Sequence, residues 1–188
     1  MKFLKLVFSF LLVASGTLSA QNQNVIRVGV GMNVRDGLSD GSNLKIGPSL
    51  FVEYGREINH FFSIALNIHT DMSKYDDYAN LHSLGISVRS LFTPFPKIFR
   101  WVKVGVGATY ERRRDIYGTE LSVDDAIVGM KYHQISSNYW GIDFPIRAYA
   151  IDNKRFELYA FYNLKTMFAE GKYFWNYSNG GIAFGVKF

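Results

Sequence analysis

The sequence contains no cysteine, and this absence removes several functional classes at once. Disulfide bonds, thiolate metal sites and cysteine nucleophiles are excluded. A lipoprotein anchor is excluded too, because that lipid is attached to a cysteine at the mature amino terminus. Long hydrophobic runs are also missing: the apolar run 6–13 is too short for a membrane-spanning helix, which needs about 20 residues, and no other stretch approaches one. If the mature chain lies in a membrane, it must therefore cross as a closed barrel, since only helices and closed barrels satisfy every backbone hydrogen bond in lipid.

A strong excess of one charge is absent as well. The chain has 21 Lys and Arg against 16 Asp and Glu, a formal net charge of +5, and Lys2 and Lys5 lie in a segment that we expect to be removed. The only basic cluster in the sequence, 112–114, is interpreted as the solvated end of a strand. We therefore predict no nucleic-acid partner. The fingerprints of zinc proteases, P-loops and dinucleotide-binding folds are missing too, so we predict no metal and no cofactor.

The amino-terminal segment has the three parts of a secretory signal peptide. Two lysines, a short apolar run and small residues ending in Leu18-Ser19-Ala20 follow one another in this order. The predicted organisation is a signal peptide over 1–20 and a single domain over 21–188. We expect no second domain to follow.

The sequence does contain a strict period of two, which is clearest at its end. In 177–188, one face collects Ile182, Phe184, Val186 and Phe188, whereas the opposite face has glycine, alanine and one lysine. Alternation of this kind predicts a β-strand with one wholly apolar face.

Seven further segments alternate in the same way, which gives eight predicted strands. They are 25–34, 45–56, 61–70, 81–92, 101–112, 138–151, 156–168 and the terminal strand. Pro48 interrupts the second one, and we expect a β-bulge there. The connections alternate in length: 57–60, 93–100 and 152–155 are short, whereas 35–43, 71–80, 113–137 and 169–176 are long. An even number of strands with short periplasmic turns and longer outer loops is typical of bacterial outer-membrane barrels. The predicted fold class is therefore all-β, an eight-stranded antiparallel up-and-down transmembrane β-barrel.

Alternation alone does not decide whether the apolar face meets lipid or fills a core. A soluble lipocalin-like barrel that binds an apolar ligand would turn this face inward. Three features favour lipid. The opposite face is rich in small residues that fit a narrow interior, it carries charges of both signs that can pair there, and aromatic residues gather near both ends of the strands.

These features assign residues to two sets. The charges predicted to form an ionic network in the lumen are Arg27, Glu53, Arg89, Lys103, Glu111, Asp143, Arg147, Glu157, Lys165 and Lys187. The aromatic residues expected at the periplasmic end are Phe61, Phe62, Phe92, Phe95, Phe99, Trp101, Phe156 and Phe188, and those at the outer end are Tyr110, Tyr139, Trp140, Phe168 and Trp175.

The closing strand resembles that of bacterial outer-membrane barrels, which ends in Phe or Trp and is read by the assembly machinery. The corresponding residues are Ile182, Phe184, Val186 and Phe188. With its signal peptide and alternating strands, the chain resembles the small OmpA/OmpX-type barrels. This resemblance implies an outer-membrane location. It also implies that the partners include outer-membrane lipid, lipopolysaccharide and the barrel assembly machinery.

Some small outer-membrane barrels are enzymes that act on lipid A with Ser, His and an acid. The segment 176–179 resembles the His-x-Ser-Asn segment of the lipid A deacylase barrels, but Asn176 stands where the general base should be. The chain also ends ten residues after Ser178, which leaves no place for the downstream acid. Because a serine without a base is a poor nucleophile, we predict no catalytic residue and no enzymatic activity. A lipid A-modifying enzyme is the alternative.

The longest break, 113–137, is the best candidate for a functional segment. It carries four carboxylates among apolar residues, and long loops in compact domains are often functional. We predict that it binds a surface partner or a cation, and the alternative is an inert or partly β-extended loop. His69, on the lumen face near Asp71, is interpreted as an interior residue with satisfied hydrogen bonds. The leading hypothesis is a structural, adhesion or surface-interaction role through outer loops, above a lumen plugged by side chains.

Overall fold

The structure is a computed structural model. It describes residues 23–35, 45–59, 61–74, 79–94, 98–123, 126–169 and 174–188. The predicted signal peptide, 1–20, lies outside these residues. Among the described residues there is no helix of the length and apolar character needed to cross a membrane.

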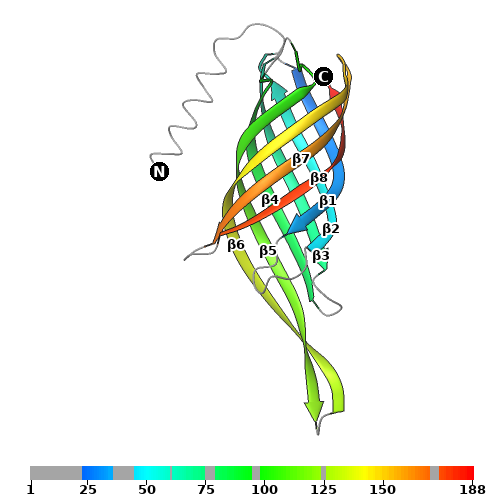
Figure 1. Cartoon of the computed structure of the whole chain (residues 1–188), viewed down its shortest axis with the longest axis vertical. Helices are drawn as coiled ribbons and strands as arrows, with labels where there is room; N and C mark the ends of the chain where they lie inside the picture. The colour runs from blue at the N-terminus through cyan, green and yellow to red at the C-terminus, as the bar shows by residue number, and fades with distance from the viewer. Residues whose placement is uncertain are drawn as a thin grey trace.

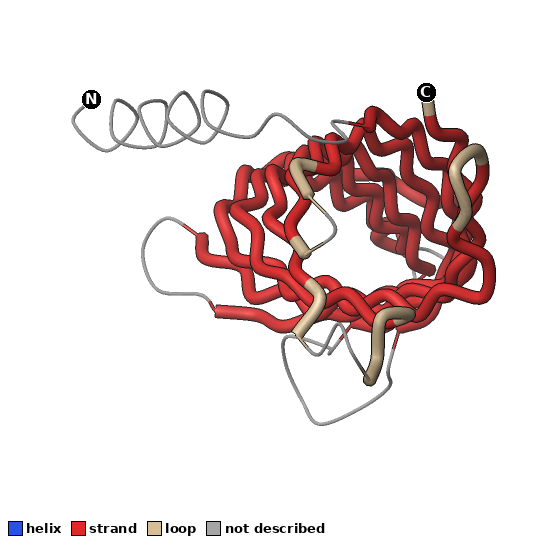
Figure 2. Tube along the Cα trace, turned by 90° about the horizontal axis from the view of Figure 1, so that it is seen from above, coloured by secondary structure: helices blue, strands red, loops and turns tan. Residues whose placement is uncertain are grey.

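The described chain forms one sheet that closes on itself (Figures 1 and 2). Its strands are β1 (Gln23–Arg35), β2 (Lys45–Glu57), β3 (Phe62–Lys74), β4 (Ala79–Phe92), β5 (Val102–Val123), β6 (Ala126–Asp152), β7 (Phe156–Ala169) and β8 (Phe174–Lys187). Each strand pairs antiparallel with the next one, and β8 pairs with β1. This confirms the predicted fold class, an eight-stranded up-and-down barrel.

Side chains alternate between the outer and inner walls because successive residues of a strand point to opposite faces. On the outer wall, large apolar side chains are exposed on every strand; Ile142 is 40% and Phe184 is 48% exposed. The inner wall carries mostly small, polar and charged side chains, together with a cluster of aromatic rings, and these are buried. An apolar outer wall around a polar interior is stable in lipid and not in water. The alternative of a soluble barrel with an apolar lumen is therefore wrong.

An asparagine side chain stabilises each of two short turns in the same way. Both turns lie at the end of the barrel that holds the C-terminus. The side-chain oxygen of Asn59 accepts hydrogen bonds of 2.8 Å from the backbone N–H groups of Phe61 and Phe62. Asn153 does the same for Arg155 and Phe156, at 2.9 and 2.8 Å. Asparagine suits this position because its side chain replaces a backbone acceptor within a tight turn.

Strands β5 and β6 are much longer than the sequence predicts. The segment 113–137 is a two-stranded extension, paired from Arg113 opposite Ser137 to Val123 opposite Ala126, which confirms the β-extended alternative. Figure 1 shows this hairpin projecting from the end of the barrel opposite the C-terminus. The extension lies beyond the barrel and encloses no lumen, so its sequence need not alternate and resembles a loop.

Pro48 does not create the predicted bulge. The pairing of β1 with β2 runs past it without a shift, and the pairing of β2 with β3 begins only at Ser49. The missing N–H of proline therefore removes no bond from the β2–β3 ladder. Where β2 and β3 are not paired, the side-chain amide of Asn33 donates hydrogen bonds to both strands. It contacts the carbonyls of Gly47 and Pro48 at 3.0 Å and of Met72 at 2.9 Å.

Aromatic side chains mark both ends of the outer wall. Those exposed at the end that holds the C-terminus are Phe61, Phe92, Phe99, Trp101, Phe156 and Phe188. At the other end, the rings of Tyr110 and Trp140 lie 4.6 Å apart, and Phe168 is the neighbour of Trp140 on β7. The prediction for Tyr139 is wrong, because its side chain packs inside the barrel near Met167. Three aromatic residues predicted at the strand ends remain. Phe62 is half-buried, and the side chains of Phe95 and Trp175 lie outside the described residues.

Candidate functional site

All ten charged residues predicted for the lumen lie on the inner wall, and none is more than 9% exposed. Six are basic and four are acidic. A buried charge without a partner destabilises a protein by several kcal/mol, so each of these groups needs a counter-charge inside the barrel.

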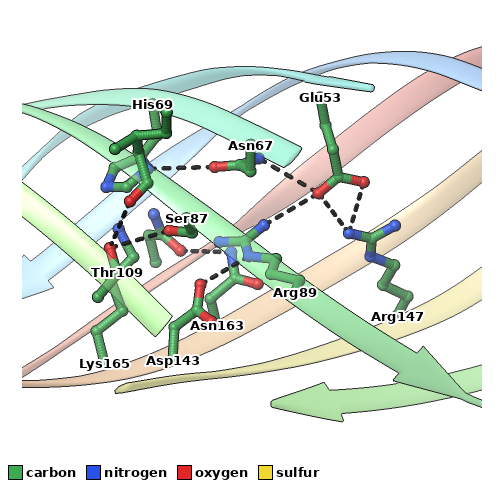
Figure 3. Close-up of polar contacts among 12 residues, drawn as sticks. Glu53, Asn67, His69, Ser87, Arg89, Thr109, Asp143, Arg147, Asn163 and Lys165 are labelled. Carbon is green, nitrogen blue, oxygen red and sulfur yellow. Dashed lines mark hydrogen bonds and ion pairs between the residues drawn. The ribbon is translucent and has the colours of Figure 1, made fainter. Parts of the chain in front are cut away.

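Glu53 on β2 is fully buried in the lumen and lies among arginine side chains (Figure 3). Its carboxylate accepts hydrogen bonds from Arg27 at 3.1 Å, from Arg89 at 3.3 Å and from Arg147 at 2.7 Å. The three arginines come from β1, β4 and β6. Hydrogen bonds to one carboxylate therefore link side chains from four strands of the barrel.

Two further carboxylates balance the remaining charge in this layer. Glu157 on β7 accepts hydrogen bonds from Arg27, and Asp143 on β6 accepts one of 2.6 Å from Arg89. Three guanidinium groups thus meet three carboxylates. Charge-assisted pairs of this kind are among the stronger hydrogen bonds in proteins.

Aromatic rings fill the space beside these ion pairs. Phe51 and Phe161 meet edge to face, with ring centroids 5.0 Å apart, and the rings of Tyr149 and Tyr159 are 4.9 Å apart. The Arg147 guanidinium lies 5.1 Å from the centre of the Tyr159 ring. All four rings are buried, so side chains occupy the lumen at this level.

A second charge group lies at the end of the lumen that holds the short turns. Lys103 donates to Glu57 at 2.7 Å, while Lys187 contacts Glu57 at 3.4 Å and also pairs with Asp152. The sequence pattern predicts turns at Glu57 and Asp152. The structure places both carboxylates at strand ends, where they reach the two lysines.

The third charge group lies toward the end of the lumen from which the β5–β6 hairpin projects. Lys165 on β7 is 3.4 Å from a carboxylate oxygen of Glu111 and 3.7 Å from one of Asp71. Its ammonium group donates to the Tyr177 hydroxyl at 2.6 Å, and that hydroxyl donates in turn to Glu111. Asp71 belongs to β3 and not to the predicted loop 71–80, so it was missed as a member of the network.

His69 lies beside this group and is buried, as expected from the sequence. Its ring nitrogens contact Asn67 at 3.2 Å and Glu111 at 2.9 Å. His69, Asp71 and Glu111 present ligand atoms within 4.8 Å of one another, a spacing that suits a metal ion. The ammonium group of Lys165 already supplies positive charge to the same two carboxylates, so this arrangement is complete without a metal.

Asn67 joins the outer charge group to the central one (Figure 3). Its amide nitrogen donates to Glu53 at 3.4 Å, and its oxygen contacts the His69 ring. A neutral asparagine was not among the predicted residues. Its place on the polar face of a strand was the only signal in the sequence.

Ser178, the residue weighed as a nucleophile, lies on the outer wall of β8. Its neighbours on the adjoining strands are Val34 and Leu164. Among the described residues, no histidine or carboxylate is hydrogen-bonded to Ser178. No residue that the structure describes is therefore placed to activate this serine as a base.

The β5–β6 hairpin presents an unpaired sheet edge. Strand β6 pairs with β7 only from Tyr139 onward, so residues 126–138 have β5 on one side and no described strand on the other. Tyr132 is 65% and Ile135 is 49% exposed along this stretch. An edge of this kind offers backbone N–H and C=O groups to another chain.

The predicted assembly residues lie on the outer wall of the closing strand, and Ile182, Phe184, Val186 and Phe188 are all exposed. Beyond β8, Phe188 exchanges two backbone hydrogen bonds with Asn24, of 2.9 and 3.0 Å. The pairing that closes the barrel thus extends to the last residue of the sequence.

Solved structures of small outer-membrane barrels have the same fold. Neisserial surface protein A aligns with a TM-score of 0.52 at 18% identity, over 90% of this chain and 99% of that chain. The attachment invasion locus protein Ail of Yersinia pestis gives 0.50 at 12% identity, over 90% and 100%. A major outer membrane protein from Thermus thermophilus gives 0.51 at 13% identity, over 87% and 99%. No protein-family model and no curated protein sequence matches this chain. The fold is therefore that of the small OmpA/OmpX-type barrels and, with the apolar outer wall, that of an outer-membrane protein.

Proposed function

We propose that this protein is a non-enzymatic outer-membrane barrel that attaches to a partner protein through its β5–β6 hairpin. The observation that carries the proposal is the unpaired edge of β6 over 126–138, which lies beyond the barrel (Figure 1). Strand addition to such an edge forms main-chain hydrogen bonds, and exposed side chains add specificity. Tyr132 and Ile135 are placed to supply that specificity.

The charge of the hairpin favours a protein partner over an anionic polymer. The segment 113–137 has three Lys and Arg residues and four Asp and Glu residues, so it carries no positive excess. The attachment invasion locus protein of Yersinia pestis has the same barrel and is named for attachment. The shared architecture supports an attachment role by analogy only.

The proposal is tested by removing the hairpin while keeping the barrel. Residues 116–134 are replaced by Asn-Gly, a two-residue turn that joins Asp115 to its partner Ile135. Cells that display this variant should adhere about tenfold less to immobilised protein layers and to each other than wild-type cells, because residues 126–134, most of the unpaired edge, are gone. Heat-modifiable migration on SDS gels should be unchanged, since the barrel pairing remains.

Two controls accompany this experiment. The variant Tyr132→Lys/Ile135→Lys keeps the hairpin but charges its edge, and it should also lose adherence. Because the sequence has no cysteine, Asn138→Cys provides a unique label that a membrane-impermeant maleimide should reach on intact cells in every variant. Unchanged adherence of the truncated variant at equal labelling would refute the attachment role.

We also propose that the lumen is plugged. The charged groups and the four buried rings that line it support this, and eight strands leave room only for packed side chains. The wild-type barrel in a planar bilayer should therefore show no steady conductance, whereas an open porin in the same bilayer conducts. A stable ohmic current that scales with the amount of inserted barrel would overturn the plugged lumen without affecting the hairpin.

A further inference from the structure

Strand geometry splits the run of three arginines in β5 between the two walls. Arg113 faces inward, is 5% exposed and donates to Asp115 at 2.7 Å. Arg112 and Arg114 point outward and are exposed. Among the side chains that the structure describes, neither of these two guanidinium groups is paired with a carboxylate. The interpretation of the cluster as a solvated strand end is therefore wrong for Arg113, whereas Arg112 and Arg114 are exposed as it predicts.

The two outward arginines border a shallow depression on the outer wall. It has a volume of about 400 Å³ and lies over β3, β4 and β5, lined by Thr70, His82, Ser83, Leu84, Arg112, Arg114 and Ile116. The strand register sets Arg112 opposite Leu84 and Arg114 opposite His82. The depression thus combines two permanent positive charges, a histidine and apolar side chains.

Its height on the barrel is fixed by the aromatic residues nearby. Tyr110, which contacts Trp140, marks the outer end of the apolar wall. Arg112 follows two residues later, about 7 Å further along the strand. On the membrane side of the depression, Leu84 and Ile86 are 61% and 43% exposed. Positive charge therefore begins where the apolar wall ends.

Positive charge beside exposed apolar side chains is complementary to an anionic group that is covalently attached to acyl chains. The guanidinium group is planar and binds phosphate through paired hydrogen bonds. An outward arginine is tolerated near the membrane interface, so its charge is available there. A soluble anion would gain nothing from the apolar side chains below.

We propose that this depression binds the phosphorylated sugar headgroup of an outer-leaflet glycolipid. Arg112 and Arg114 hold the phosphate, His82 lies beside it, and the acyl chains lie along the wall at Leu84 and Ile86. The site is separate from the edge of β6 on which attachment depends. The barrel would then hold an ordered glycolipid against the base of the hairpin.

Native mass spectrometry of the full-length mature barrel, with diphosphoryl lipid A as the probe, tests this. Arg112→Gln/Arg114→Gln should weaken binding about tenfold or more, because both charge-assisted contacts are lost. The matched control is Arg56→Gln, since Arg56 is also exposed on the outer wall but lies on β2 near the opposite end of the barrel. It should bind like the wild type. Heat-modifiable migration verifies that every variant is folded.

Three outcomes would overturn the proposal. They are equal binding by the double variant, equal binding of lipid A stripped of its phosphates, and complete displacement of the lipid by millimolar inorganic phosphate. The first two would indicate apolar contact only, and the third a site for free anions. Adherence of Arg112→Gln/Arg114→Gln cells should stay at the wild-type level, so failure of this proposal is distinguishable from failure of the attachment role.

Discussion

Replacement of Glu53 by alanine is expected to destabilise the barrel by about 3–5 kcal/mol, because removal of one partner from a buried ionic group leaves uncompensated charge. Glu53 is fully buried and accepts hydrogen bonds from three arginines. Without it, three guanidinium groups share two carboxylates, Asp143 and Glu157. Water cannot reach these buried groups freely. Neither solvent nor a change of side-chain rotamer therefore replaces the missing negative charge.

Urea unfolding of the barrel in detergent or lipid measures this loss as a change in the free energy of unfolding. Glu53→Gln keeps the shape and removes the charge, and it should lose most of the same stability. Asp152→Asn is the matched control, because its pair with Lys187 is 32% exposed on the Asp152 side and solvent screens such a pair. A loss under about 1 kcal/mol is expected there. Equal effects of Glu53→Ala and Asp152→Asn would mean that the central group does not stabilise the fold.

Gly181→Val is expected to prevent the barrel from closing. Gly181 on β8 faces Gly31 on β1, at the seam where the last strand meets the first. A Cβ atom on Gly181 would lie 2.1 Å from the carbonyl oxygen of Val30 and 2.5 Å from the Cα atom of Gly31. These are backbone atoms held in a ladder, so the strands must separate to admit a side chain. The loss should reach about 3 kcal/mol, at the upper end of overpacking effects.

The adjacent glycine provides the control for this prediction. A Cβ atom on Gly180 would meet the carbonyl oxygen of Phe161 at 3.3 Å and a ring carbon of Tyr162 at 3.5 Å, which requires only a small adjustment. Gly180→Ala should therefore keep the heat-modifiable form on SDS gels, whereas Gly181→Val should migrate as an unfolded chain with or without heating. A folded Gly181→Val barrel would show that the seam tolerates wider strand spacing.

The sequence predicts most of the barrel because each strand separates two environments. Lipid on one side and packed side chains on the other force a period of two, and this period indicates which wall Phe184 or Arg147 faces. It also gives the number and order of the strands. The choice between lipid and a soluble core came from composition, since glycine and paired charges suit a narrow interior.

Two features could not be read from the pattern. The first is the identity of the ion pairs. Glu53 lies 94 residues from Arg147 in the sequence, and their contact depends on the stagger between strands, which alternation does not specify. The second is the length of β5 and β6. Beyond the membrane the period of two is no longer enforced, so residues 113–137 look like a loop although they are paired strands.

The length of the β5–β6 hairpin determines which part of the protein a large molecule meets first at the cell surface. From Arg114 to Val123, β5 extends about 30 Å at its usual rise per residue. In the orientation that the proposed attachment requires, that distance places the far part of the hairpin well beyond the membrane surface. An antibody that approaches an intact cell would then meet the hairpin first, while the membrane covers the wall of the barrel.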